Sequence, residues 1–292
     1  MKNILITGAG SYVGMSVERY LEKWPDCYRV DSVDMVGDGW REKSFQGYDV
    51  VLHVAGIVHQ ADSKNDPKQA ALYEKVNTRL AIETAEKAKA EGVGQFIFMS
   101  TASVYGLDAP LGKLITITAD TLLEPKDNYG VSKLKAEEGL RPLAGDGFFK
   151  LAVLRPPMIY GKGCKGNYQK LAALAKKLPA FPYVENQRSM LYIENLAEFI
   201  RLIVDDGAEG TFCPQDGEYV NTCDMVNLIA HCHGKGILMV KGFTWALKLL
   251  RPVTGMVDKA FGSLCYDWSL SSYPKDYCVK SVADAVRETE AD

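Results

Sequence analysis

The N-terminal segment constrains the fold of this chain more than any other part of the sequence. A short apolar run, Lys2–Thr7, is followed by Gly8-Ala-Gly10-Ser-Tyr-Val-Gly14 and by a helical pattern over residues 13–24. This order is typical of a dinucleotide-binding fold, because glycines let the backbone approach a pyrophosphate and a helix N-terminus presents free amides. The residues expected to bind the cofactor here are Gly8, Gly10, Ser11, Tyr12, Val13 and Gly14.

An acidic residue stands where such a fold binds the adenosine ribose. A second predicted strand, Tyr28–Val33, ends at Asp34, which falls 20 residues after Gly14. This carboxylate can accept hydrogen bonds from both ribose hydroxyls and would repel a 2′-phosphate, so the sequence favours NAD over NADP. The alternative is a glycine turn and a capping aspartate in an α/β protein that binds no phosphate.

The first half of the chain alternates strands and helices. This alternation predicts an α/β fold, a Rossmann-type doubly wound parallel sheet. With 292 residues, of which 47% are hydrophobic, the chain can bury a full core. We expect residues 1–160 to form an NAD-binding domain that carries the catalytic side chains. Residues 161–292 should form mainly a smaller, C-terminal substrate-binding lobe, with some segments returning to the core.

A tyrosine and a lysine at helical spacing suggest acid/base chemistry. Tyr129 and Lys133 stand four residues apart and share one helix face. A phenol titrates near 10, and a nearby ammonium favours the phenolate and lowers that pKa. The hydroxyl of Thr101, which follows the apolar run Gln95–Met99, can hold the same substrate oxygen. We interpret Thr101, Tyr129 and Lys133 as catalytic, although an amphipathic surface helix would also explain the Tyr/Lys pair alone.

Charge and hydropathy exclude several classes of protein. The net charge is −3 with both signs mixed along the chain, so there is no basic footprint for nucleic acid. No uninterrupted apolar segment reaches the length of a membrane span, and the first apolar stretch stops at Thr7, short of a secretion signal. We expect a cytoplasmic enzyme with neither a nucleic acid nor a membrane as partner.

The cysteines and histidines predict no metal site. Seven cysteines, an odd number without a Cys-x-x-Cys motif, argue against a disulfide framework or a structural zinc. His231-Cys232-His233 closes a predicted helix that begins near Thr222. Adjacent helical residues diverge by about 100° each, which is a poor arrangement for one ion.

Together these motifs resemble the extended short-chain dehydrogenase/reductase superfamily, in its NAD-dependent epimerase/dehydratase branch that acts on nucleotide sugars. The family motif is usually Thr-Gly-x-x-Gly-x-x-Gly; here Ser11 replaces the middle glycine and Gly10 comes one position early. The resemblance implies NAD as cofactor. It also implies cofactor contacts at positions outside the glycine turn, namely Val54, Ala55, Gly56, Asn77, Ser100, Tyr129, Lys133 and Pro156.

The resemblance also implies substrate-binding residues. Asn167, at the entrance to a helix predicted over residues 168–178, and Arg188 resemble residues that contact the nucleotide diphosphate. A guanidinium suits bidentate phosphate binding, although a solvated arginine is the alternative. Ser103 is a further candidate. His59 would lie on a substrate-facing loop, whereas His53, inside an apolar strand, is expected to be a satisfied core histidine.

The residues that follow Thr101 limit the number of reactions that the chain is expected to catalyse. Dehydratases of this family usually have Asp-Glu there, and decarboxylating members a Glu, but this chain has Ala102-Ser103. The resemblance then leaves two reactions at C4: epimerisation of a UDP-hexose or UDP-HexNAc with retained NAD, or NAD(P)H-dependent reduction of a nucleotide 4-keto sugar. Asp34 favours the epimerase. A non-catalytic nucleotide-sensing regulator is a third possibility, but such proteins generally lose the Tyr/Lys pair.

Two more segments carry expectations about assembly and the lobe. In resembling proteins the helix that Asp66-Pro67 begins and the Tyr129 helix form a dimer interface, so a homodimer is expected, although both helices could merely cover the sheet.

The stretch 243–261 is basic and amphipathic. It is consistent either with a membrane-surface helix or, as the resemblance favours, with a lid or a helix of the lobe.

Overall fold

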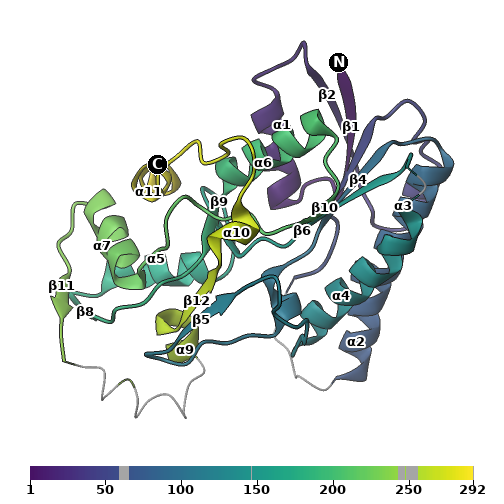
Figure 1. Cartoon of the computed structure of the whole chain (residues 1–292). Helices are drawn as coiled ribbons and strands as arrows, with labels where there is room; N and C mark the ends of the chain where they lie inside the picture. Colours follow the sequence, from purple (N-terminus) through teal and green to yellow (C-terminus); the bar gives the residue numbers. More distant parts are fainter. Residues whose placement is uncertain (59–65, 146, 243–246, 248–255, 292) are drawn as a thin grey trace. The chain divides into compact units, whose positions relative to one another are not determined.

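The chain forms two compact units, each built from more than one segment. The computed structural model describes residues 1–58, 66–145, 147–242, 247 and 256–291 (Figure 1). The first unit contains residues 1–106, 122–156 and 197–213, and the second contains 107–121, 157–196 and 214–292. The sequence therefore does not divide at one point near residue 160. The assignment of cofactor and substrate to the two parts stays a prediction.

A six-stranded sheet forms the centre of the first unit. Its order is β10-β6-β4-β3-β1-β2, and every neighbouring pair is parallel. This confirms the predicted α/β fold with a doubly wound parallel sheet. The strands are β1 Lys2–Thr7, β2 Tyr28–Val33, β3 Val50–His53, β4 Gln95–Met99, β6 Lys150–Leu154 and β10 Gly210–Phe212.

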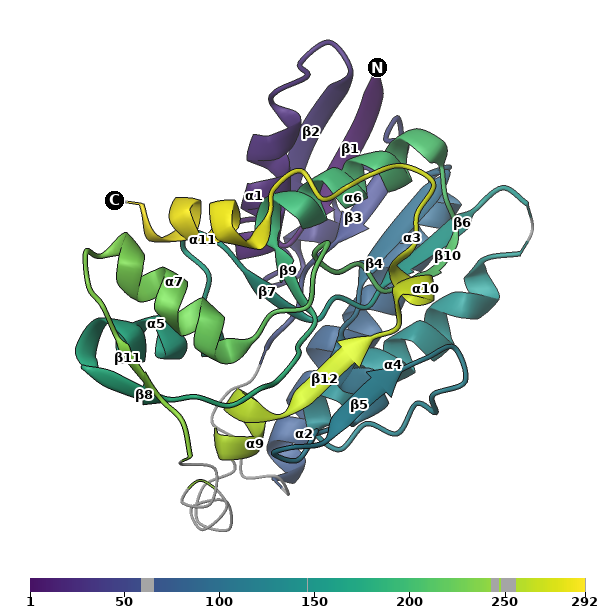
Figure 2. The same ribbon diagram turned by 60° about the vertical axis from the view of Figure 1, so that its left-hand side comes forward.

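Helices cover both faces of this sheet (Figure 2). On one face lie α1 (Tyr12–Leu21) and α6 (Ile193–Asp206), where the Tyr20 hydroxyl donates to Glu198 at 3.1 Å. On the other lie α3 (Leu80–Ala90) and α4 (Asn128–Leu140). Alternate strand residues point to this second face and pack with small helical residues, because side chains alternate along a strand. This core includes Leu5, Val51, Phe96, Phe98, Leu151, Val153, Ala81, Ala85, Ala136 and Leu140.

The long helix predicted after Asp66-Pro67 is interrupted by a π-helical turn. Asp66 caps α2 (Pro67–Tyr73) by accepting from the Lys68 amide at 2.9 Å. Residues Glu74–Arg79 then form the π turn, and α3 follows without a break. Such single turns occur often at functional sites. Hydrophobic spacing alone does not reveal the extra residue per turn.

The second unit contains three short parallel strand pairs and five described helices. The pairs are β5 (Leu114–Ile117) with β12 (Ser263–Tyr266), β7 (Met158–Tyr160) with β9 (Met190–Tyr192), and β8 (Ala180–Pro182) with β11 (Leu238–Val240). The helices are α5 Asn167–Lys177, α7 Thr222–Cys232, α9 Met256–Phe261, α10 Trp268–Ser271 and α11 Val282–Glu290.

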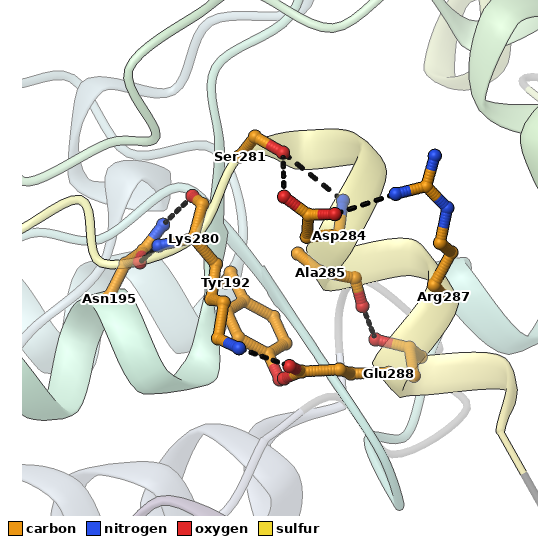
Figure 3. A network of polar contacts seen from close by, with 9 residues as sticks. Tyr192, Asn195, Lys280, Ser281, Asp284, Ala285, Arg287 and Glu288 are labelled. Carbon is orange, nitrogen blue, oxygen red and sulfur yellow. Dashed lines mark hydrogen bonds and ion pairs between the residues drawn. The ribbon is translucent and has the colours of Figure 1, made fainter.

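A network of polar contacts holds α11 within the second unit (Figure 3). The Tyr192 hydroxyl donates to Glu288 at 2.8 Å, and Lys280 forms an ion pair with the same carboxylate. Asn195 donates to the Lys280 carbonyl oxygen at 3.2 Å and accepts from its amide at 3.0 Å. Because side chains of β9 and α6 make these contacts, they fix the start and the last turn of α11.

Candidate functional site

The glycine turn after β1 requires its first glycine for steric reasons. Gly8 has φ = 99°, and a Cβ there would lie 2.9 Å from backbone atoms of Ala55. Its amide donates to the Val33 carbonyl oxygen at 2.9 Å. The turn is therefore held against the ends of both neighbouring strands, β2 and β3.

The departure from the family's glycine spacing has a simple local explanation. Ser11 has an extended backbone (φ −70°, ψ 146°), needs no glycine, and caps α1 by accepting from the Gly14 amide at 3.2 Å. Gly10 takes the left-handed conformation instead, at φ = 76°. A Cβ on Gly14 would lie 3.1 Å from Ile6 of β1, so this glycine allows close packing of helix and strand.

The first turn of α1 suits an anionic ligand. It contains no acidic residue, and the N–H groups that begin a helix carry a partial positive charge. Tyr12 and Val13 are the first two residues of the helix. The turn therefore fits the diphosphate of a dinucleotide, although these contacts stay a prediction.

Hydrogen bonds of the glycine turn hold the end of β2, which is followed by Asp34, the residue predicted to bind the ribose. The amides of Gly8 and Ala9 both donate to Val33, the residue before Asp34. Asp34 is exposed, and its Oδ1 accepts from the Val36 amide at 3.0 Å. One oxygen of the Asp34 carboxylate thus accepts a hydrogen bond within a local turn, while the carboxylate remains exposed to solvent.

Asp34→Asn is expected to raise the affinity for NADPH relative to NADH by about tenfold, or about 1.4 kcal/mol. The amide keeps an oxygen for the Val36 turn but removes the charge that repels a 2′-phosphate. Titration of the protein fluorescence with each reduced cofactor measures the ratio. Asp31→Asn, on β2, is the control. If the ratio of NADPH affinity to NADH affinity were unchanged in Asp34→Asn, Asp34 would not be the residue that binds the ribose.

Asn77 ties the loop after β3 to the catalytic helix. It is fully buried in the π turn, accepts from the Ile57 amide at 2.8 Å, and donates to the Ile57 carbonyl at 3.0 Å. Its Nδ2 also contacts the Ser132 hydroxyl of α4 at 3.1 Å. A Cβ on Gly56 would lie 3.0 Å from the Asn77 Oδ1 and 3.4 Å from the Lys133 ammonium. The predicted cofactor residues Val54, Ala55 and Gly56 thus lie on a loop fixed against α4.

The structure brings the predicted catalytic threonine and tyrosine together. Thr101 caps the 3-10 turn Ala102–Tyr105, and its side chain forms a hydrogen bond with the buried Tyr129 phenol. The Thr101 hydroxyl also contacts the Ser103 hydroxyl at 3.3 Å. A Cβ on Gly130 would lie 2.6 Å from the Ser103 carbonyl, so α4 begins directly against this turn.

The strand ends around the turn are also fixed. The Ser100 amide donates to the Leu154 carbonyl at 2.7 Å, and the Ala102 amide donates to the Pro156 carbonyl at 3.0 Å. The candidates Ser100, Thr101, Ser103 and Pro156 therefore lie at the carboxyl ends of β4 and β6. Ligands of open α/β sheets bind at this edge.

The predicted effect of Lys133 on Tyr129 is wrong for this structure. Burial raises the pKa of Tyr129 to about 12, and the hydrogen bond with Thr101 lowers it only in part. Lys133 is not among the groups that shift this pKa; its ammonium donates to the Met99 carbonyl at 2.8 Å and lies 4.7 Å from the centroid of the Phe98 ring. Burial lowers the pKa of Lys133 to about 8. At neutral pH Tyr129 is therefore protonated and suited to donate a proton.

His53 lies in the core, as the sequence predicts. It is fully buried, its Nδ1 lies 2.8 Å from the Thr7 hydroxyl, and its ring stacks near Phe96 and Phe98. Burial and the charge of Lys133 lower its pKa to about 3, so it is neutral. Only one ring nitrogen is hydrogen-bonded, since Nε2 has no such partner within the described ranges.

The other substrate candidates belong to the second unit or lie outside the described residues. Asn167 is exposed at the start of α5, where the preceding Gly166 gives no side-chain cap. The half-buried Arg188 guanidinium donates to the Gly262 carbonyl at 3.1 Å. Burial lowers the Arg188 pKa, and Cys265 and Asp108 raise it. His59 and most of the segment 243–261 lie outside the described residues.

The His231-Cys232-His233 motif makes local contacts. The α7 cap is Asn221, one residue before the predicted Thr222, because Asn221 accepts from the Cys223 amide at 2.7 Å. His231 lies 2.7 Å from the Asn227 carbonyl, and His233 lies 2.7 Å from Glu290. The part of the chain that the structure describes holds no group of three or more residues able to bind a metal.

Sequence reasoning missed one buried ion pair in the first unit. Arg155, at the end of β6, donates from Nε and Nη2 to the carboxylate of Glu137 on α4 at 3.0 and 2.5 Å. Glu137 stands four residues after Lys133, so it continues the helix face that Tyr129 and Lys133 begin. The signal available in the sequence was a glutamate on the same helix face as Lys133 and the apolar Leu140.

No helix that could cross the apolar layer of a bilayer occurs in the described ranges.

The glycine turn, the acidic residue after β2 and the Thr/Tyr/Lys group are together typical of a dinucleotide-binding α/β protein, with candidate acid/base side chains at the carboxyl edge of its sheet. The chain belongs to the NAD-dependent epimerase/dehydratase family, whose model matches residues 4–213. The prediction of NAD as the cofactor is confirmed at the level of the family.

A curated relative supports this membership, and two solved structures share the fold. The chain is 31% identical to UDP-glucose 4-epimerase of Vibrio cholerae, over 92% of this chain and 88% of that protein. Its fold is similar to UDP-glucuronic acid 4-epimerase from Bacillus cereus in complex with NAD, with a TM-score of 0.73, 18% identity and coverage of 99% and 97%. A dTDP-4-dehydrorhamnose reductase from Clostridium acetobutylicum gives a TM-score of 0.73, 19% identity and coverage of 98% of each chain.

Proposed function

We propose that this chain is a nucleotide-sugar 4-epimerase that oxidises and re-reduces C4 of a UDP-hexose or UDP-HexNAc while retaining NAD. The observation that carries the proposal is the hydrogen-bonded pair Thr101 and Tyr129, one helical turn from the buried Lys133. The relationship to the Vibrio cholerae enzyme over nearly the whole length of both proteins supports the choice of an epimerase.

The side chains have separate roles in this proposal. When bound, NAD supplies hydride transfer at C4. Tyr129 exchanges a proton with the C4 oxygen, and Thr101 orients that oxygen by a hydrogen bond. The Lys133 ammonium, beside the Gly56 loop, supplies a positive charge that would stabilise the negative charge that develops when the C4 hydroxyl loses its proton.

The second unit would hold the nucleotide part of the substrate. Arg188 is half-buried, and no carboxylate forms an ion pair with it in the described residues. A partly buried cation without an ion-pair partner is costly, and a diphosphate would supply that partner. Asn167 would add a contact at the open N-terminus of α5.

Arg188→Lys is expected to raise KM for the UDP-sugar by roughly 10- to 100-fold, because one charge-assisted hydrogen bond contributes about 1.5–3 kcal/mol. The kcat should change much less, since the diphosphate does not react. Steady-state kinetics of both constants test this. Arg287→Lys, an exposed arginine paired with Asp284 in the same unit, is the control. Equal KM values in both variants would contradict the diphosphate role.

A reductase of a nucleotide 4-keto sugar would use the same three side chains, so an assay must separate the two reactions. The pure native protein is incubated with UDP-sugars, with and without added NADH or NADPH, and the dinucleotide released on denaturation is identified. Interconversion of 4-epimers without net cofactor consumption is the expected result. Stoichiometric oxidation of NADH or NADPH with a 4-keto sugar would favour the reductase instead. Inactivity in both assays would favour a nucleotide-sensing regulator.

Two further proposals concern assembly and location. A homodimer through α2 and α4 is the assembly that the family resemblance implies, and Leu72 and Val131 are apolar residues exposed on these helices, at 42% and 36%. The cytoplasmic location stays a prediction.

A further inference from the structure

The buried pair of Glu137 and Arg155 lies behind the candidate catalytic residues. Glu137 is 0% exposed and Arg155 is 6% exposed. Removing two charges from water is costly, and well-packed apolar residues often stabilise a fold equally well. Stability alone is therefore a weak explanation for a charged pair at this place.

The pair is connected to both ends of the segment that contains Thr101. The Ser100 hydroxyl donates to Glu137 Oε1 at 2.5 Å, and the same oxygen accepts from Arg155 Nε at 3.0 Å. At the other end of the segment, Arg155 Nη1 donates to the Tyr105 hydroxyl at 3.0 Å. These contacts hold the catalytic segment against α4, since Glu137 belongs to that helix.

The Glu137 carboxylate also acts on Lys133. Burial lowers the pKa of Lys133 to about 8, and the charge of Glu137 opposes this decrease. The other titratable groups near the ammonium are neutral at pH 7: His53 at the end of β3 and Tyr129 on α4 itself. Arg155 and Arg141 both form ion pairs with Glu137, at 2.5 and 3.6 Å, and partly neutralise the carboxylate. Within the described residues, Glu137 is thus the anion that keeps the lysine charged.

We propose that Glu137 and Arg155 form a positioning pair, in which Glu137 keeps the Lys133 ammonium charged and both side chains hold the Thr101 segment in register with Tyr129. This inference rests on the proposed function, because Lys133 and Thr101 are assigned there. It adds two residues that touch neither the substrate nor the cofactor but act through residues that do.

Glu137→Gln tests the proposal, because glutamine keeps the length and hydrogen-bonding capacity of the side chain and removes its charge. The alkaline limb of kcat is expected to move to lower pH by about one unit, since an opposite charge nearby shifts a pKa by about 1–3 units. The sign follows from Lys133: its active form is protonated, and loss of the anion lets the proton leave at lower pH. KM should stay within about twofold.

A second readout does not depend on activity. In protein labelled with ¹³C at the lysine ε-carbons, the Lys133 resonance is identified by its absence in Lys133→Arg. Its titration midpoint should fall in Glu137→Gln by the same amount as the kinetic limb. If the native protein shows no turnover, this midpoint still tests the pair, so failure of the inference can be distinguished from failure of the proposed function.

Glu198→Gln is the matched control. Glu198 accepts from Arg201 through both of its oxygens at 2.7 Å, and it is also buried in the first unit. We expect Glu198→Gln to lower stability without moving either the kinetic limb or the Lys133 midpoint. If Glu137→Gln behaves in the same way, the pair is merely structural and the proposal is overturned.

A double variant covers the case in which Glu137→Gln fails to fold because Arg155 is left unpaired. Glu137→Gln/Arg155→Gln removes both charges and should fold. Its Lys133 midpoint is still expected below that of the unmodified protein, because the anion nearest to the ammonium is gone. An unchanged midpoint in this folded variant would overturn the proposal.

Discussion

Tyr129→Phe is expected to lower kcat by about 10²- to 10⁴-fold, the usual contribution of a positioned acid/base group. The substitution removes only the hydroxyl that hydrogen-bonds with Thr101, while the ring can keep its packing against Tyr73, whose ring centroid lies 6.4 Å away. The decrease should appear in kcat and not in the affinity for NADH. Steady-state kinetics and fluorescence titration measure the two quantities.

Tyr48→Phe controls for loss of a tyrosine hydroxyl elsewhere in the first unit. The Tyr48 hydroxyl donates to Asp31 at 2.8 Å and takes no part in the proposed chemistry. Its kcat should stay within about twofold of the unmodified protein, as expected for a hydrogen bond with a net contribution to stability of about 1 kcal/mol. If Tyr129→Phe kept more than a tenth of the original kcat, the phenol would not be the catalytic proton donor.

Gly106→Ala is expected to lower the free energy of unfolding by roughly 2–5 kcal/mol, the sum of a left-handed backbone penalty and an overpacking penalty. Gly106 ends the 3-10 turn that Thr101 caps, with φ = 60°. A Cβ there would lie 1.8 Å from the Glu124 carbonyl oxygen, which is backbone and cannot move aside easily. Denaturant unfolding measures the loss, and kcat should fall as well because the turn carries Thr101 and Ser103.

Gly92→Ala separates the two penalties. Gly92 also has a positive φ, 86°, but nothing lies within 4 Å of its Cβ position. Its loss should therefore be about 1–2 kcal/mol, the backbone penalty alone. Equal losses in the two variants would mean that the segment before Pro125 yields to the new methyl group, and that the contact with Glu124 has no structural importance.

The sequence predicted most of the sheet of the first unit well because β1, β3, β4 and β6 are largely buried parallel strands. Lys2–Thr7 and Gln95–Met99 have the bounds that their apolar runs indicate, and turn residues or polar residues mark where each run stops. The predicted side chains at the ends of β1, β2 and β4 lie at the carboxyl edge for the same reason. Strand polarity alone determines which residues reach that edge.

Electrostatic relations at the site could not be predicted from spacing. Tyr129 and Lys133 share a helix face, but the direction of each long side chain depends on the strands beneath it. The Met99 carbonyl binds the ammonium, and burial dominates the pKa of the phenol. The Glu137–Arg155 pair joins residues 18 positions apart, a contact that no local pattern contains.

The strand pairing within the described part of the second unit could not be predicted from local sequence patterns either. Its strands are three or four residues long, and β5 pairs with β12, which lies far along the chain. Segments 107–121 and 157–196 join 214–292 through such pairs. Short strands carry little periodicity, so the sequence indicates a lobe without indicating its pairing.

The π-helical turn between α2 and α3 makes this stretch intolerant of changes in length. Removing one residue there would rotate everything that follows by about 100° relative to what precedes it. Asn77 could then not face Ile57 while Ala81 and Ala85 kept their places beneath the sheet. Insertions and deletions in this stretch are therefore expected to be harmful, although the solvent exposure of the helix alone would suggest that they are tolerated.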